Sequence, residues 1–243
     1  MPRCAGFPPW GRTSSLASGS GFEAAPMIDG LSLRMDDTAV VVTSPRPLTI
    51  LSSAVHGGGF QSARTIINLH VAKHDPCVDP AAMLDAFARR AAVPVPYVGL
   101  LTGAWTELAT TGEEGGAGIA TLAVATVGLS NRMAAAHGPI QVWMPGTINT
   151  IVVVDANPDP PALVNAVMTA TEVKTLALHE AGLRDAEGRP ATGTSTDAVV
   201  IAATGRGGDI RFGGPASELG WSIAQAVYKA LTAGIRSWQE RNP

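Results

Sequence analysis

The pattern of apolar and polar positions divides the chain into an unpatterned leader and one long patterned region. Residues 1–26 are rich in Pro, Gly and Ser and show no periodicity, which is typical of segments that bury too little apolar surface to fold. They also lack the apolar run of about 7–15 residues that a secretory signal needs. We therefore expect a disordered leader over 1–26, or a translation start placed upstream of Met27, and a single domain over 27–243.

The N-terminal half of this domain has the pattern of short strands. Apolar runs follow one another closely, with Asp, Pro or Gly between them, and such tight spacing predicts antiparallel pairing. The predicted strands lie at residues 30–37, 38–44, 48–55, 65–71, 97–103 and 119–131. A helix is predicted over 79–93, because Asp79 and Pro80 are start signals and arginines stand near its end.

The C-terminal half combines two buried-type strands, at 148–154 and 198–203, with two long helices, at 162–182 and 214–242. We expect both helices to pack over the strands near Ile151 and Val199. The predicted fold class is α/β, in the α+β sense: a single domain with mixed and antiparallel sheets and two long packed helices.

The composition argues against several classes of binding partner. The chain is 46% hydrophobic and 15% charged with a formal charge of −3, so it lacks the basic surface that nucleic acid or an anionic membrane attracts. No apolar run reaches the roughly 20 residues of a membrane helix, so membrane insertion is not expected. The two cysteines, Cys4 and Cys77, give no disulfide framework, and a cytoplasmic location fits best. The sequence leaves open whether the chain forms a homo-oligomer.

Small and polar residues gather at the ends of the predicted strands, where backbone amides can meet a ligand without a side chain in the way. The glycines can equally form a sharp turn, and the last polar pair of the 119–131 strand can equally cap residues 132–138. The candidate ligand contacts are Ser52, Ser53, Gly57, Gly58, Gly59, Asn68, Ser130, Asn131 and Asn149.

The helix over 162–182 carries an isolated Glu172 and Lys174 among small apolar residues. At about 100° per residue, Glu172 shares a face with Thr169 and His179, whereas Lys174 points well away from it. Two interpretations stay open. Both charges can be solvated surface groups, or they can point into a cleft.

A loop with four hydroxyl groups stands directly before Asp197 and the last strand: Thr192, Thr194, Ser195 and Thr196. Alternating Gly and Ser/Thr residues can form a nest that holds an oxyanion or a phosphate. The loop lacks the lysine and the following helix of a P-loop, which disfavours nucleotide binding. A turn capped by its own hydroxyls is the structural alternative.

Seven stretches between Leu48 and Ile235 together resemble the adenosylcobinamide amidohydrolase family of corrinoid salvage. They are LSSAVHGGG, TIINLHV, ATVGLSNR, GTINTIVVV, TATEVKTLAL, ATGTSTDAVV and GPASELGWSIAQAVYKA. The resemblance implies hydrolysis of the amide between the aminopropanol arm and the corrin ring, with adenosylcobyric acid as product. It implies a corrinoid partner that brings its own cobalt, so no cofactor of the protein itself is expected.

Two catalytic schemes are compatible with the residues. No His and Cys cluster has metal-ligand spacing, so no protein metal is expected, and no G-x-S-x-G elbow is present. In the first scheme Glu172 activates water, Lys174 or Asp197 orients or protonates, and the 192–196 loop with Asn149 stabilises the oxyanion. This scheme is preferred, because a carboxylate among small apolar helix residues can be poised as a base.

In the second scheme a hydroxyl group of Thr194, Ser195 or Ser130 attacks and forms an acyl-enzyme. Two other functions are also compatible with the sequence. The chain can be a non-catalytic corrinoid-binding or carrier protein, or an amidase that acts on an unrelated amide.

Overall fold

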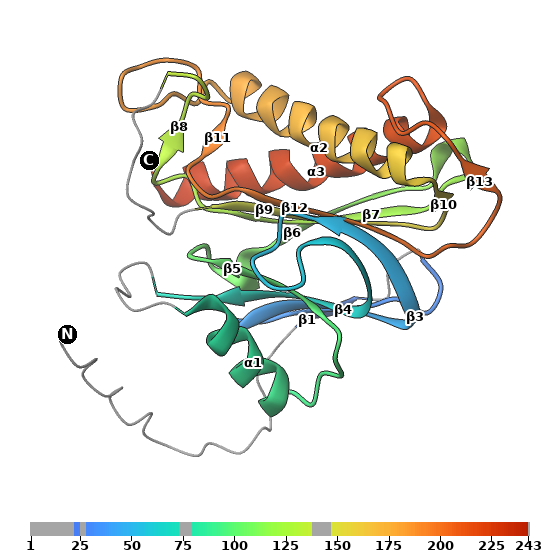
Figure 1. The fold of residues 1–243 in the computed structure, drawn as a ribbon. Helices are drawn as coiled ribbons and strands as arrows, with labels where there is room; N and C mark the ends of the chain where they lie inside the picture. Colours follow the sequence, from blue (N-terminus) through green and yellow to red (C-terminus); the bar gives the residue numbers. More distant parts are fainter. Residues whose placement is uncertain (1–21, 25–27, 73–78, 138–146, 243) are drawn as a thin grey trace.

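The computed structural model describes residues 22–24, 28–72, 79–137 and 147–242. These residues form four layers, in the order helices, sheet, sheet, helix (Figure 1). The main sheet contains β1 (Phe22–Ala24), β2 (Ser32–Met35), β3 (Ala39–Ser52), β4 (Gly59–His70), β5 (Val98–Thr102), β6 (Thr110–Glu114), β7 (Thr121–Val127), β9 (Ile148–Val154) and β12 (Ala198–Ala203). The helices are α1 (Pro80–Arg90), α2 (Pro160–Glu180) and α3 (Glu218–Arg241), with short 3-10 turns at Thr106–Leu108 and Gly116–Gly118.

Two small strand pairs complete the fold. β8 (Arg132–Met133) pairs antiparallel with β11 (Gly193–Thr194), and β10 (Asn157–Pro158) pairs parallel with β13 (Asp209–Ile210). The mixed α/β architecture with two long packed helices confirms the predicted fold class.

The long strand β3 connects the two sheet layers. Two strands were expected at 38–44 and 48–55, but a single strand crosses both regions, with a register shift between Thr43 and Leu48. Pro45 and Pro47 lie within this shift, where a missing backbone donor breaks no ladder bond. The first part of β3 pairs with β2 and its last part pairs with β12, so the strand belongs to both layers.

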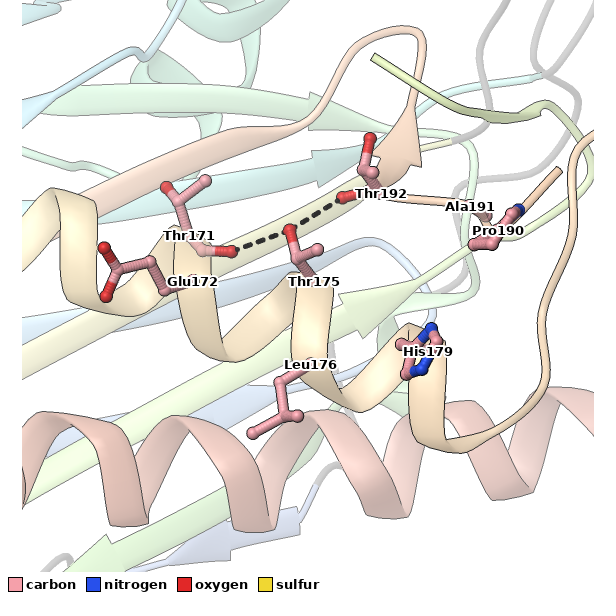
Figure 2. A pocket seen from close by; sticks show the side chains of 8 residues that line it. All are labelled: Thr171, Glu172, Thr175, Leu176, His179, Pro190, Ala191 and Thr192. Atoms are coloured by element: carbon pink, nitrogen blue, oxygen red, sulfur yellow. Dashed lines mark hydrogen bonds between the residues drawn. The ribbon is translucent and has the colours of Figure 1, made fainter.

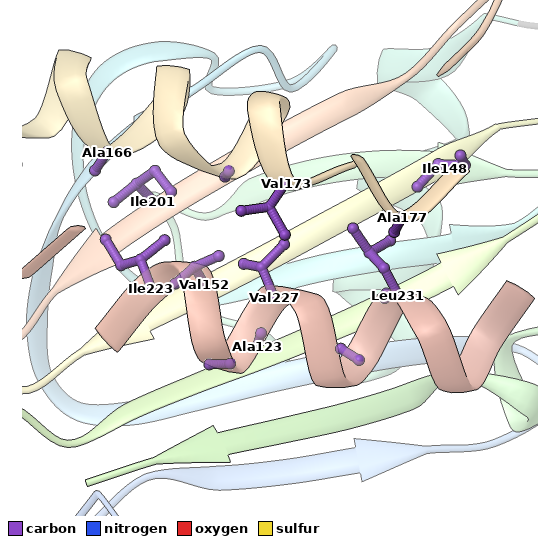
Figure 3. Close-up of a cluster of buried hydrophobic side chains, with 14 of the residues drawn as sticks. Ala123, Ile148, Val152, Ala166, Val173, Ala177, Ile201, Ile223, Val227 and Leu231 are labelled. Carbon is purple, nitrogen blue, oxygen red and sulfur yellow. The ribbon is translucent and has the colours of Figure 1, made fainter. Parts of the chain in front are cut away.

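α2 and α3 cover one face of the main sheet, with α2 over β12 and α3 mainly over β6 and β7 (Figure 3). Both helices were expected near Ile151 and Val199, but α3 lies over neighbouring strands of the same sheet. Val173 from α2 and Val227 from α3 meet above Val152 of β9 in a continuous buried cluster. Alanines on α2, among them Ala166 and Ala177, let the helix approach the sheet closely.

Side chains alternate along β9 because successive strand residues face opposite sides. Val152 therefore packs under the helices, whereas Ile151 enters a second core between the two sheet layers together with Val42, Ile66 and Val200. A third core lies between the outer sheet layer and α1. Asp79 caps this helix, as predicted, by accepting a hydrogen bond from the Ala82 amide at 3.1 Å.

Two sequence expectations need correction. Phe22–Ala24 was assigned to the disordered leader, but it forms β1, which pairs antiparallel with β2. The capping interpretation of Ser130 and Asn131 is also wrong, because the following Arg132–Met133 is the strand β8 and not the start of a helix. The remaining leader residues, 1–21 and 25–27, lie outside the described residues. Among the described helices, none has the length and apolar character needed to cross a membrane.

Gly112 of β6 allows α3 to pack directly on the sheet. A Cβ atom at this position would lie 2.1 Å from the Ala226 carbonyl oxygen and 2.8 Å from the Ala230 amide nitrogen. We expect Gly112→Ala to lower the free energy of unfolding by about 1–3 kcal/mol, because α3 must shift away from β6. Urea denaturation measures this change. Gly208→Ala is the matched control, since a Cβ there meets nothing within 4 Å; equal midpoints for the two variants would contradict the packing argument.

Candidate active site

The carboxylate of Asp197, directly before β12, collects hydrogen bonds from three separate segments. Lys174 Nζ of α2 forms an ion pair with Oδ2, and the Thr194 amide donates to the same oxygen at 3.1 Å. The Thr194 hydroxyl and the Ile148 amide, the latter at 3.0 Å, donate to Oδ1. The side chains of Lys174 and Asp197 are only 15% and 14% exposed, so the pair is largely shielded from water.

Gly193 leaves the space that this ion pair occupies. A Cβ atom on Gly193 would lie 2.3 Å from Asp197 Oδ2 and 2.8 Å from Lys174 Nζ. The β8–β11 pairing fixes Gly193 opposite Met133 and Thr194 opposite Arg132. Gly193 was not among the residues predicted from the sequence, although its position between Thr192 and Thr194 was the available signal.

A buried polar network continues from this centre into the space between the sheets. The Thr147 hydroxyl donates to the Thr196 carbonyl at 2.7 Å and lies 3.1 Å from Asn149 Oδ1. Asn149 Nδ2 donates to Asn68 Oδ1 at 2.8 Å and to the Leu101 carbonyl at 2.9 Å. Because Asn68 belongs to β4 and Asn149 to β9, this network joins the two sheet layers.

Asn68 also donates to the Thr126 hydroxyl at 2.9 Å, and Asn131 Nδ2 donates to Ser195 Oγ at 2.6 Å. The structure therefore brings most of the polar candidates to one region, although their sequence positions span more than a hundred residues. The members of this region that the sequence predicted are Asn68, Asn131, Asn149, Lys174, Thr194, Ser195, Thr196 and Asp197. Thr126 and Thr147 also belong to this region, but they were not predicted as site residues.

Chemically, the centre presents a hydroxyl group to a carboxylate that an ammonium group also contacts. Such an arrangement can remove a proton from the hydroxyl as it attacks and can supply a proton to a leaving group.

Glu172 and Thr192 lie apart from this centre. Both line an open depression of about 470 Å³ on the outer side of α2, with Thr171, Thr175, Leu176, His179, Pro190 and Ala191 (Figure 2). Glu172 is exposed, and its carboxylate points away from Thr192. The Thr192 hydroxyl accepts a hydrogen bond from the Ala135 amide at 2.9 Å, and its carbonyl accepts one from Thr175 at 3.3 Å.

The serine candidates take different positions. Ser53 Oγ accepts a hydrogen bond from the Val199 amide at 3.0 Å, so Ser53 lies beside β12, next to the residue that comes two positions after Asp197. Ser52 is buried at the end of β3, and Ser130 is exposed in the turn between β7 and β8.

The glycines of the loop after β3 lie very close to neighbouring backbone atoms. A Cβ atom on Gly57, whose φ is +62°, would lie 2.6 Å from the Tyr97 carbonyl oxygen, and one on Gly58 would lie 2.2 Å from the Ala54 carbonyl oxygen. Gly59 pairs with Ser52 at the start of β4. His56 stacks on the Tyr97 ring at 4.3 Å between centroids. Burial and the neighbouring Asp85 carboxylate raise the pKa of the Tyr97 hydroxyl above its ordinary value.

Within the described ranges, no group of three or more His, Cys, Asp or Glu side chains is arranged to hold a metal ion. Cys4 and Cys77 lie outside these ranges.

Comparison with protein families gives one match over nearly the whole chain. The model of the family described as adenosylcobinamide amidohydrolase matches residues 25–243. A curated Methanosarcina mazei protein named adenosylcobinamide amidohydrolase is 37% identical over 99 residues, which are 37% of this chain and 46% of that protein. An uncharacterized Methanocaldococcus jannaschii protein is 35% identical over 92 residues, 37% of this chain and 36% of that protein. The matched part thus spans less than half the length of these relatives.

Solved structures show weaker likenesses. The PH0078 protein of Pyrococcus horikoshii OT3 matches with a TM-score of 0.45 and 14% identity, over 92% of this chain and 82% of that chain. A Burkholderia sp. beta-aminopeptidase has a TM-score of 0.41 and 13% identity, over 86% and 81% of the two chains. An Ochrobactrum anthropi L-aminopeptidase D-Ala-esterase/amidase has a TM-score of 0.38 and 13% identity, over 89% and 82%. With TM-scores below 0.5, these likenesses carry no argument about chemistry.

The hydrogen bonds of Asn149 hold the two sheet layers together beside the centre. We expect Asn149→Ala to lower the free energy of unfolding by about 2 kcal/mol or more, because it leaves buried acceptors on Asn68 and Leu101 unsatisfied. Asn157→Ala removes the same side chain from an exposed hydrogen bond to Asp209 and serves as the control. Equal urea midpoints for both variants would show that the network adds no more than a surface contact.

Proposed function

Because the chain belongs to the adenosylcobinamide amidohydrolase family, we propose that it hydrolyses the amide between the aminopropanol arm and the corrin ring of adenosylcobinamide. The products are adenosylcobyric acid and the free amine, and the reaction serves corrinoid salvage in the cytoplasm. The cobalt belongs to the substrate. The observation that carries the proposal is the Thr194 hydroxyl held on the Asp197 carboxylate, which in turn pairs with Lys174.

In the proposed mechanism the Thr194 oxygen attacks the amide carbonyl while its proton passes to Asp197 Oδ1. The C–N bond then breaks, and Lys174 gives a proton to the departing amine. The proton on Asp197 restores the lysine, since the two groups are hydrogen-bonded. Water hydrolyses the resulting ester and regenerates the hydroxyl group, so atoms and charge balance over the cycle.

The geometry favours this scheme over the one in which Glu172 activates water. Glu172 is exposed on the outer face of α2, whereas Lys174, two residues later, points to Asp197. Asn149 uses both hydrogens of its amide nitrogen on Asn68 and Leu101, which supports a positioning role for it and not contact with an oxyanion. The glycines of the 57–59 loop and the hydroxyl groups of Ser195 and Thr196 remain proposed contacts to the amide side chains of the corrinoid.

Thr194→Ala tests the nucleophile. We expect it to lower turnover of adenosylcobinamide by about a thousandfold or more, because the attacking oxygen is gone, while Thr194→Ser keeps measurable activity. Mass analysis of adenosylcobyric acid gives the rate, and intact-protein mass after an acid quench detects the acyl-enzyme in the wild type. A wild-type rate for Thr194→Ala would exclude this mechanism. For the wild-type protein, corrinoid binding without any product would instead support a carrier, and the absence of both binding and product would support an unrelated amidase.

Glu172→Gln separates the two schemes. The substitution keeps the shape of the side chain and removes the carboxylate, so we expect turnover within about twofold of wild type if Thr194 is the nucleophile. Loss of turnover by orders of magnitude with unchanged corrinoid binding would restore Glu172 as the base. Asp197→Asn, assayed in parallel, should be strongly impaired in either scheme.

A further inference from the structure

A second hollow, of about 190 Å³, lies between the segments that follow β5 and β7 and the end of α3. We call it the Trp105–Trp238 hollow after the two indole rings in its wall. Its lining mixes aromatic, small and polar residues, and includes Trp105, Leu108, Gly128, Trp238, Arg241 and Asn242. Pockets that enclose a whole small molecule typically measure about 300–1,000 Å³, so this hollow has room for one group of a larger ligand.

Trp105 is held in place from one side by an imidazole ring. His70 stacks on it with 4.8 Å between ring centroids and 17° between ring planes, and His70 Nδ1 lies 2.9 Å from the Ala104 carbonyl oxygen. Trp105 nevertheless stays 56% exposed. A fixed and exposed indole ring on a folded surface is ready to stack on a planar group at little entropic cost.

Trp238 is held in a similar way by a cation. The Arg132 guanidinium lies 5.5 Å from the Trp238 ring centroid. Arg132 is itself fixed, because Nε donates to the Arg184 carbonyl at 2.8 Å and a terminal nitrogen donates to the Leu129 carbonyl at 2.7 Å. Both indole rings of the hollow are therefore pre-organised by a stacked polar group.

Short connections link the hollow to the proposed catalytic centre. The Gly128 amide in its wall donates to the Thr147 carbonyl at 3.0 Å, and the Thr147 hydroxyl donates to the Thr196 carbonyl at 2.7 Å. Arg132, which holds Trp238, is also the strand partner of Thr194. The hollow and the catalytic centre are thus joined through Thr147 and through the β8–β11 pairing.

We propose that the Trp105–Trp238 hollow receives the adenine of the adenosyl group while the amide of the corrinoid lies at Thr194. This proposal rests on the proposed function. A purine is a planar group that can stack on the exposed face of Trp105, and stacking of a base on an aromatic side chain contributes substantially to binding. Asn242 also lines the hollow: one hydrogen of its Nδ2 bonds the Trp238 carbonyl at 2.8 Å, and its other hydrogen and Oδ1 suit the N6–N7 edge of adenine.

Trp105→Ala tests the proposal, with adenosylcobinamide and dicyanocobinamide as the two probes. Dissociation constants are measured by spectral titration in a Thr194→Ala background, and KM and kcat are measured in the active enzyme. We expect Trp105→Ala to weaken binding of adenosylcobinamide by about tenfold and to change binding of dicyanocobinamide by less than about twofold. Trp105→Phe should recover most of the loss, because it restores an aromatic face.

Trp221→Ala is the matched control, since Trp221 is also exposed, at 41%, but packs near Gly116 and not in the hollow. Equal weakening of both corrinoids by Trp105→Ala, or no weakening of either, would overturn the adenine assignment. The two proposals fail separately. An enzyme that hydrolyses adenosylcobinamide without needing Trp105 refutes only the subsite, and a protein that binds it through Trp105 without hydrolysis refutes only the amidohydrolase function.

Discussion

The hydrogen bonds accepted by the Asp197 carboxylate fix the positions of α2, the 192–197 loop and the start of β9 at one point. A carboxylate shielded from water must be paired and hydrogen-bonded to persist there, and Lys174, Thr194 and Ile148 supply those partners. The same bonds that satisfy the charge also aim the Thr194 hydroxyl. Structural stability and proposed chemistry therefore depend on a single group.

This arrangement requires the layers around it to be close. β3 bends through its register shift and passes from one sheet layer to the other, so that β4 lies beneath β9 and Asn68 meets Asn149. The small residues of α2 bring Lys174 near enough to the loop to reach Asp197, and Gly193 leaves room for both side chains. Each of these features is a packing constraint, and together they fix the centre at which we propose that the substrate amide is attacked.

The two tryptophans of the Trp105–Trp238 hollow, which we propose receive the adenine, are likewise held by neighbouring polar groups. His70 and Arg132 hold their rings, and Thr147 lies between the hollow and the loop that carries Thr194. The loop thus connects the ion pair, through Thr194, with Arg132 of β8, which holds Trp238.

Strand and helix patterns in the sequence predicted the fold class and two long helices packed on a sheet, because the periods of 2 and 3.6 residues are local properties. The family resemblance carried by the seven stretches was confirmed by the match over residues 25–243. Local patterns also indicated Thr194, Asp197 and Lys174 as candidates. They could not show that Lys174 and not Glu172 faces Asp197, since which face of a helix meets a loop is set by packing between segments distant in sequence. Only the tertiary structure showed that Lys174 pairs with Asp197, that the two predicted strands are one strand, β3, and that position 193 needs glycine. Each of these features depends on atoms that only folding brings together.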